Sequence, residues 1–240
     1  MASEAITDKL IELSQVLVAD DGLDATLGRV ARLSTSLIDA CDSCGVSLIR
    51  DGSVSTRAAS DERADRIDDI QYSHGEGPCL QAIETGETVH VTSFAQEERW
   101  PQFIESALDE GIRASYSVPL RVEQNVVGSL NFYSIDGAFT DSDKQIGDVL
   151  ASQAAVALHN ARTFNEVLNL VDQLNEALAS RDLIGQSKGI LMANLSLGPD
   201  QAFDVLRRES QNRNVKLRDL AEQVVSGAVV IDGASVDSAP

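Results

Sequence analysis

The spacing of apolar residues along the chain predicts several kinds of element in turn. Residues 3–38 place leucine, isoleucine and valine at helical intervals on either side of Gly22, which predicts two helices, the second packed on a sheet. From residue 45 the apolar residues recur at every second position instead. Residues 45–61 predict a strand, an Asp51-Gly52 turn and a second strand, which is the usual signal for a hairpin. A polar stretch follows.

Short elements alternate between residues 75 and 137. The segment 75–86 predicts a short helix, because Pro78 suits its first turn and Gly86 its end. A strand, a second helix and two further strands follow, with turn residues between them. Strands that pair as hairpins and alternate with helices indicate an α+β domain, with a mainly antiparallel sheet and flanking helices, over about residues 1–160.

A long helix is predicted next, with its cap at Asp141 or Asp143. Its apolar positions follow alternating steps of four and three residues without a slip, which is the heptad repeat of a coiled coil. The repeat predicts a parallel coiled-coil dimerisation helix over residues 143–180, and hence a homodimer. Docking of this helix on its own domain fits only residues 146–158. The predicted seam consists of Ile146, Leu150, Gln153, Ala157, Asn160, Phe164, Val167, Val171, Leu174 and Leu178.

The pattern beyond residue 180 predicts a small all-helical unit. The long helix continues to about Leu195, and a turn follows at residues 196–199. Two more runs with helical spacing then predict a second and a third helix. This three-helix unit covers about residues 170–230, and the composition of residues 231–240 is that of a flexible tail.

Charge separates this terminal unit from the rest of the chain, whose formal net charge is −19. Residues 1–166 hold 12 basic and 28 acidic residues, whereas residues 181–218 hold 7 basic and 4 acidic ones. A local cationic surplus on an acidic protein is typical of a module that binds a polyanion, although a mixed-charge helical surface gives the same count. The acidic remainder argues against wrapping by nucleic acid and against an anionic membrane surface.

Two glycines lie inside the predicted helix of the terminal unit. Each costs about 1 kcal/mol relative to alanine, so another group is expected to approach them closely. Two interpretations are open. Gly185 and Gly189, with Ala193, pack against the third helix, or Gly189 leaves room for a phosphate or a base beside Lys188. Arg181 lies seven residues before Lys188 and so shares its face of the helix.

Cysteine and histidine suggest little chemistry in this sequence. Cys41 and Cys44 form a CxxC without a second pair or a nearby histidine, which argues against a redox or zinc role. His74 and Cys79 border the predicted helix at residues 75–86 and are weak candidates for contact with a ligand of the first domain. No catalytic motif is present, so we expect no enzymatic activity, no metal and no cofactor.

Three segments of the terminal unit read SRDLIGQSKGILM at 180–192, QAFDVLRRESQ at 201–211 and LRDLAEQVV at 217–225. Together they resemble the ANTAR domain, the RNA-binding module of bacterial transcription antitermination regulators. Residues 1–160 resemble the GAF sensory domain through the segments GEGPC, RWPQF, SVPL and GSLNFYS. GAF followed by ANTAR is a known pairing in bacterial regulators.

The resemblance implies a function. In a dimer, each copy would hold one of two small stem-loops in a nascent transcript, which prevents formation of the terminator hairpin. The GAF-like domain would control this by sensing an unidentified small ligand or a redox signal, or it would mediate contact with a partner. Splayed loop bases offer edges that a closed A-form groove hides. The residues that would contact RNA are Arg181, Gln186, Ser187, Lys188, Gly189, Arg207, Arg208, Gln211 and Lys216. Gly189 would also shape the surface, together with Ala193, Ala202 and Phe203.

Two alternatives to this function remain from the sequence. One is a signalling scaffold whose C-terminal helices bind a protein partner rather than RNA, and the other is a thiol redox protein that uses Cys41 and Cys44. The amino-terminal residues lack the apolar run of a signal peptide, and no stretch is long and apolar enough to span a bilayer. We therefore expect a cytoplasmic protein without membrane contact.

Overall fold

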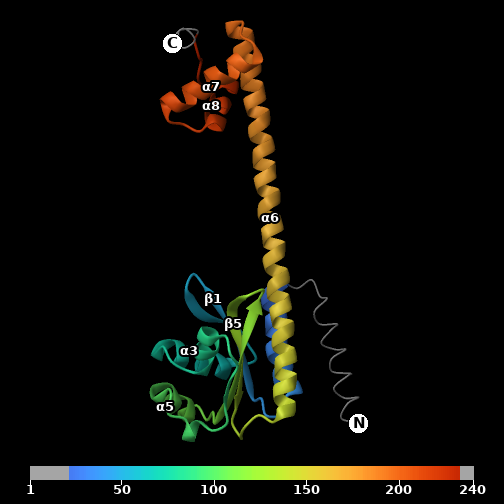
Figure 1. Cartoon of the computed structure of the whole chain (residues 1–240), viewed down its shortest axis with the longest axis vertical. Coiled ribbons are helices and arrows are strands. Elements are labelled where there is room, and N and C mark those ends of the chain that lie inside the picture. The colour runs from blue at the N-terminus through green and yellow to red at the C-terminus, as the bar shows by residue number, and fades with distance from the viewer. Residues whose placement is uncertain (1–21, 233–240) are drawn as a thin grey trace, which may run out of the picture. The chain divides into compact units, whose positions relative to one another are not determined.

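The computed structural model describes residues 22–232, which fall into two compact units that meet in sequence between Phe164 and Asn165. Figure 1 shows the elements of both units. The first of the two helices predicted in residues 3–38 lies outside the described residues. Helix α6, Asp141–Leu195, contributes its first part to one unit and its remainder to the other, so the prediction of one long helix is confirmed.

The first unit is built on a five-stranded antiparallel sheet with the strand order β2-β1-β5-β4-β3. Strands β1, Ser43–Arg50, and β2, Ser53–Ala59, form the predicted hairpin, and both residues of its turn have positive φ. Strands β4, Ala114–Val122, and β5, Asn125–Ser134, form a second hairpin, while β3, Val89–Val91, pairs with β4 at the sheet edge. The predicted antiparallel sheet is confirmed.

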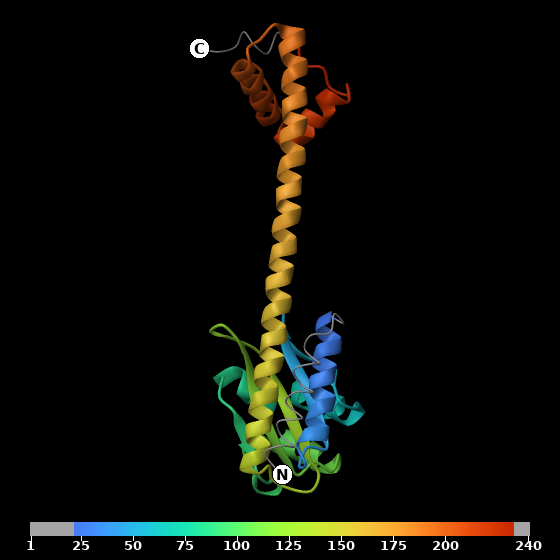
Figure 2. The ribbon, with the colours of Figure 1, turned by 90° about the vertical axis from the view of Figure 1, so that its right-hand side faces the viewer.

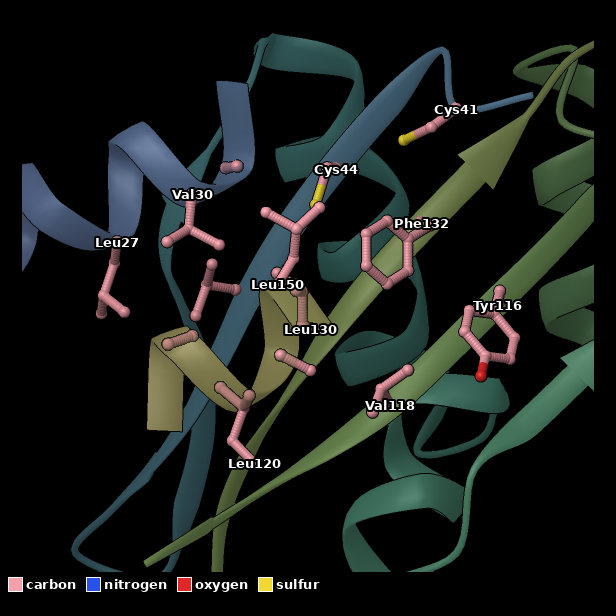
Figure 3. Close-up of a cluster of buried hydrophobic side chains, with 14 of the residues drawn as sticks. Leu27, Val30, Cys41, Cys44, Tyr116, Val118, Leu120, Leu130, Phe132 and Leu150 are labelled. Carbon is pink, nitrogen blue, oxygen red and sulfur yellow. The ribbon is translucent and has the colours of Figure 1, made fainter. Parts of the chain in front are cut away.

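One face of the sheet is covered by α2, Gly22–Leu37, and by the first part of α6, which lie side by side (Figures 1 and 2). Figure 3 shows Leu27 of α2 and Leu150 of α6 among the side chains of the strands. Leu150 is fully buried there, and Ile146 packs against the same cluster. The assignment of Leu150 to a dimer seam is therefore wrong, because the sheet already covers it, whereas Ile146 is only partly covered.

The other face carries α3, Glu62–His74, α4, Pro78–Thr85, and α5, Pro101–Asp109, with the 3-10 turn η1, Phe94–Gln96, at its edge. The predicted helix at residues 75–86 is α4. Helix α3 was not predicted, because the polar composition of residues 62–74 hid its period. It begins after Asp61, whose carboxylate accepts hydrogen bonds from the amides of Arg63 and Ala64 at 2.9 and 3.0 Å.

Thr140 caps the long helix, rather than Asp141 or Asp143. The Asp143 amide donates to Thr140 Oγ1 at 3.2 Å, and the Asp143 carboxylate accepts from the Thr140 amide at 2.9 Å. This reciprocal pair satisfies two amides that the start of a helix leaves without a partner.

The second unit packs α7, Pro199–Arg213, and α8, Leu217–Val225, against the last turns of α6. Its core contains Leu191, Leu206 and Leu220, all buried. Helix α7 ends at Asn214, which adopts the left-handed conformation with a φ of 52°. Ile231, which the sequence places in the flexible tail, is instead buried in this core, so the ordered unit extends at least to that residue.

Candidate functional site

Lys188 of α6 and Phe203 of α7 meet on the surface of the terminal unit. The Lys188 Nζ lies 5.7 Å from the centroid of the Phe203 ring, which is within range of a cation–π interaction. Both side chains are half-buried, so the ring restrains the ammonium group while leaving it accessible. Arg181 is exposed and lies two turns earlier on the same face of α6. These residues form a defined cationic surface.

Ion pairs divide the cations of this unit into two groups. Arg207 pairs with Asp204 at 3.1 Å, Arg213 with Glu209 at 3.0 Å, and Arg218 with Glu176 at 2.5 Å. Among the described residues, no carboxylate pairs with the other four cations. Their charge is not neutralised locally, so they provide the stronger attraction for an anion. These four are Arg181, Lys188, Arg208 and Lys216.

The remaining residues predicted to contact RNA do not share one position. Gln186 and Gln211 are exposed. Ser187 is fully buried, and its hydroxyl donates to the Ile184 carbonyl at 3.0 Å, so its assignment as an RNA contact is wrong. It faces the core of the unit because its neighbours at helical spacing, Ile184 and Leu191, also face it. Ala202 is buried in that core as well.

Gly185 and Gly189 are exposed inside α6. A Cβ atom added at either glycine would have no heavy atom within 4 Å among its possible contacts. Packing of these glycines against the third helix is therefore contradicted for the single chain. Of the two interpretations, the one that remains is open space beside Lys188 that another molecule can enter.

An exposed apolar face runs along α6 from the last residue of the first unit onward. Phe164, Val167, Val171, Leu174 and Leu178 are between 46% and 63% exposed. Full burial of such side chains contributes about 1.5–3 kcal/mol each, so leaving them in water has a large cost. No helix within residues 22–232 is both long and apolar enough to cross a membrane.

The first unit contains a cluster of buried polar side chains between the sheet and helices α3 and α4, which we call the polar cluster. Asp68 of α3 is fully buried and accepts hydrogen bonds from Tyr133, from Thr56 at 2.9 Å and from Asn131 at 3.2 Å. Its carboxylate lies directly over Gly45, where a Cβ atom would come within 2.2 Å of Asp68 Oδ2. The glycine in β1 therefore makes room for this carboxylate.

Burial changes the protonation of Asp68. It raises the pKa of this carboxyl to about 7, against the opposing effect of the hydrogen bonds from Tyr133, Thr56 and Asn131. Every group that donates to it is uncharged. On the same face of the sheet, the hydroxyls of Ser115 and Ser117 and the Oδ1 atom of Asn131 are buried without a hydrogen-bond partner among residues 22–232. The polar cluster thus has unused hydrogen-bonding capacity.

Of the two weak candidates for ligand contact, the structure places only Cys79 in this polar cluster. Its thiol lies 3.2 Å from Ser47 Oγ, and burial raises its pKa to about 12, so it stays protonated. His74 is exposed at the end of α3. The sequence reasoning missed Asp68, although its position beside Ile67 on a face shared with Ala64 was the available signal.

Cys41 and Cys44 are free thiols in the core beneath α2 and α6 (Figure 3). A hydrogen bond with Cys44 and burial hold the pKa of Cys41 well above its usual range. A thiol that stays protonated is a poor nucleophile and a poor metal ligand. Cys41 is therefore unreactive in the folded protein, and Cys44 is a fully buried side chain of the same core.

Family models match both units. A model described as the GAF domain matches residues 20–159, and one described as the ANTAR domain matches residues 172–225. Among curated proteins, none matches the chain.

Solved structures share the fold of the first unit. The GAF domain of a phosphoenolpyruvate-protein phosphotransferase from Coxiella burnetii is 16% identical with a TM-score of 0.54, and covers 67% of this chain and 96% of that one. The corresponding domain from Acinetobacter is 15% identical with a TM-score of 0.52, at coverages of 67% and 96%. The chromophore-binding domain of a bacteriophytochrome from R. palustris is 11% identical with a TM-score of 0.52, at coverages of 67% and 63%. At these identities the likeness concerns the fold alone.

Proposed function

Since the chain belongs to the GAF domain family and carries an ANTAR domain at residues 172–225, we propose that it is a homodimeric, RNA-binding transcription antiterminator. ANTAR domains are known for RNA binding in antitermination, and GAF domains are sensory domains. In the proposed mechanism, each ANTAR unit holds one stem-loop of a nascent transcript, and the pair prevents the terminator hairpin from forming. The sensory unit controls this binding.

The four cations that pair with no carboxylate among residues 22–232 are the observation that carries this proposal. Arg181 and Lys188 follow one face of α6, and Arg208 and Lys216 add charge from α7 and from the start of α8. Phosphates of an RNA backbone are attracted to such a surface, and open loop bases can stack on an aromatic ring such as Phe203. The site therefore fits a folded RNA with exposed loops.

A selection experiment tests RNA binding and identifies the preferred loops at the same time. A pool of RNAs with two adjacent stem-loops and randomised loop bases is passed over the full-length protein, and over Lys188→Glu in parallel. We expect enrichment of defined loops by the wild type alone, and read-through of a terminator that overlaps the selected stem-loops in transcription in vitro. Equal enrichment by the Lys188→Glu protein, with its helix content unchanged by circular dichroism, would remove Lys188 from the site. No enrichment by either protein would remove the function.

Arg207 and Arg208 provide a matched comparison within one helix. Arg207 is paired with Asp204, whereas Arg208 has no described carboxylate partner. Arg208→Gln is therefore expected to weaken RNA binding more than Arg207→Gln. For each phosphate contact that a variant loses, the slope of log affinity against log salt concentration should become less steep by about 0.7 to 0.9. Equal slopes for both variants would contradict the division into paired and unpaired cations.

A further inference from the structure

A groove lies on the α6 side of the sheet, between that helix and strand β4. Among the described residues, β3 pairs with β4 at residues 115–117, whereas β4 continues to Val122, so the rest of this edge has no neighbouring strand. The groove is lined there by residues of β4 between Val118 and Val122 and by residues of α6 between Asp148 and His159. Its volume of about 670 Å³ suits a small organic molecule. All of these residues belong to the first unit, and the polar cluster lies on the other face of the sheet.

The uncovered edge of β4 does not suit a peptide strand. Pro119 has no amide hydrogen to donate, and the ladder with β5 is irregular between Leu120 and Arg121. Proline and bulges are features with which sheet edges resist pairing with another chain. The groove therefore favours a small molecule over an added strand.

Asp148 contributes a carboxylate to the groove. The Tyr116 hydroxyl donates to its Oδ1 atom at 2.7 Å. Burial, together with this hydrogen bond, holds the pKa of Tyr116 well above its ordinary value, so the hydroxyl keeps its proton and stays a donor. Among residues 22–232, no cation pairs with Asp148, and Lys144, one turn earlier, pairs with Asp141 at 2.6 Å instead. The carboxylate thus keeps an oxygen for an outside donor.

Apolar side chains line the groove beside this carboxylate. Val118 and Ala151 are buried, whereas Val156 is 50% exposed. Ala155, on the same stretch of α6, adds only a methyl group to this wall. A carboxylate next to an apolar wall matches a molecule that joins an ammonium group to a hydrocarbon chain.

The charges around the groove disfavour an anionic ligand. Arg121 donates to the Gly86 carbonyl at 2.6 Å, which holds its guanidinium at the end of α4. Glu123 adds a second carboxylate to the lining. The net charge of −19 on the whole chain attracts cations and repels anions.

We propose that this groove binds a linear aliphatic amine, with its ammonium group on the Asp148 carboxylate and its hydrocarbon chain along Val118, Ala155 and Val156. The inference goes beyond the proposed function and does not depend on it, because neither RNA nor a second copy of the chain takes part. Asp148 is exposed, so the ion pair alone is weak, and the hydrocarbon chain supplies most of the affinity.

Hexylamine, 1-hexanol and hexanoate separate the two contributions, because they share one hydrocarbon chain and differ in charge. The full-length protein contains three histidines, so carbon-13 labelling of histidine gives few ring signals, and His159→Gln identifies the signal of His159 in the groove. In titrations at constant pH and salt that follow this signal, we expect hexylamine to bind at least about threefold more tightly than 1-hexanol, and hexanoate to bind more weakly than either. Butylamine should bind about fourfold more weakly than hexylamine, since two half-covered methylenes are lost.

Two variants decide whether the binding is local. Asp148→Asn keeps an oxygen for the Tyr116 hydroxyl, so the protein should fold while hexylamine loses its advantage over 1-hexanol. Asp109→Asn removes an exposed carboxylate of α5 on the other face of the sheet and should change nothing. Equal losses in both variants would mean diffuse attraction of cations to the acidic surface and would overturn the proposal. An unshifted His159 signal, or equal affinities of the wild type for hexylamine and 1-hexanol, would overturn it as well.

Discussion

Replacing Gly189 by alanine is expected to stabilise the folded protein and, at the same time, to weaken its binding to RNA. The two effects have separate origins. Gly189 lies inside α6, where glycine is a poor helix former, and its exposed backbone borders the surface that contains Lys188. Gly185, one turn earlier in the same helix, is equally open but was not assigned to RNA contact, so Gly185→Ala is the matched control.

The gain in stability follows from the absence of any steric cost. No heavy atom of the described chain that could contact the new methyl group lies within 4 Å of its position at either glycine. Each alanine therefore contributes about 1 kcal/mol through helix propensity and through a smaller entropy of the unfolded chain. The methyl group at residue 189 occupies space that the RNA would use, so affinity should fall by about threefold to tenfold, which corresponds to roughly 1 kcal/mol.

Hydrogen exchange and RNA binding measure the two effects independently. Amides of residues 180–195 should exchange about fivefold more slowly in both alanine variants, since 1 kcal/mol of local stability has that effect. Fluorescence anisotropy with a selected RNA should show weaker binding for Gly189→Ala alone. Faster exchange in both variants would refute the reasoning, because it would mean that the glycines are packed in the protein in solution. Slower exchange with unchanged RNA affinity would refute only the role of Gly189 in the site.

Four further results are expected. The folded state keeps the proton of Asp68 up to pH about 7, whereas the unfolded carboxyl loses it near pH 4. The free energy of unfolding, followed by urea titration, should therefore fall by up to about 4 kcal/mol as the pH rises through this window, and Asp68→Asn should remove that dependence. Leu150→Ala should cost about 2–5 kcal/mol in thermal or urea unfolding of the first unit, because this leucine is fully buried; a seam residue would lower dimer affinity instead. The three buried thiols should not react with Ellman's reagent until the protein unfolds, and rapid reaction in the native state would revive a redox role. Arg181→Gln should tighten the dimer without RNA and weaken RNA binding, as measured by sedimentation and by anisotropy.

Local signals explain why most elements could be predicted from the sequence. Asp51 and Gly52 set the first hairpin, and Pro78 with Gly86 set the ends of α4, because these residues act through the backbone at their own positions. Helix α3 could not be found in the same way. Its buried face includes Asp68 and Gln71, and polar residues that face a core do not produce an apolar period.

The seam and the RNA contacts show a different limit. A heptad repeat indicates that a residue packs against another element, but it does not identify that element. Leu150 fits the repeat because it packs against the sheet of its own unit, whereas Leu174 also fits the repeat and is exposed in the single chain. Likewise, Ser187 and Lys188 are neighbours in the motif, yet only the packing of α7 and α8 decides that Ser187 faces inward. Tertiary contacts between distant segments set these assignments.

The end of the exposed apolar face of α6 links dimerisation to RNA binding in a physical way. Arg181 lies three residues after Leu178, and no described carboxylate pairs with it. If two copies pair through Leu178, their Arg181 side chains approach within roughly the distance between packed helices, about 10 Å, and repel each other by about 1 kcal/mol. An RNA phosphate between them would convert that repulsion into attraction. Because linkage is reciprocal, RNA that relieves the repulsion must strengthen the dimer, and dimerisation must strengthen RNA binding by the same factor.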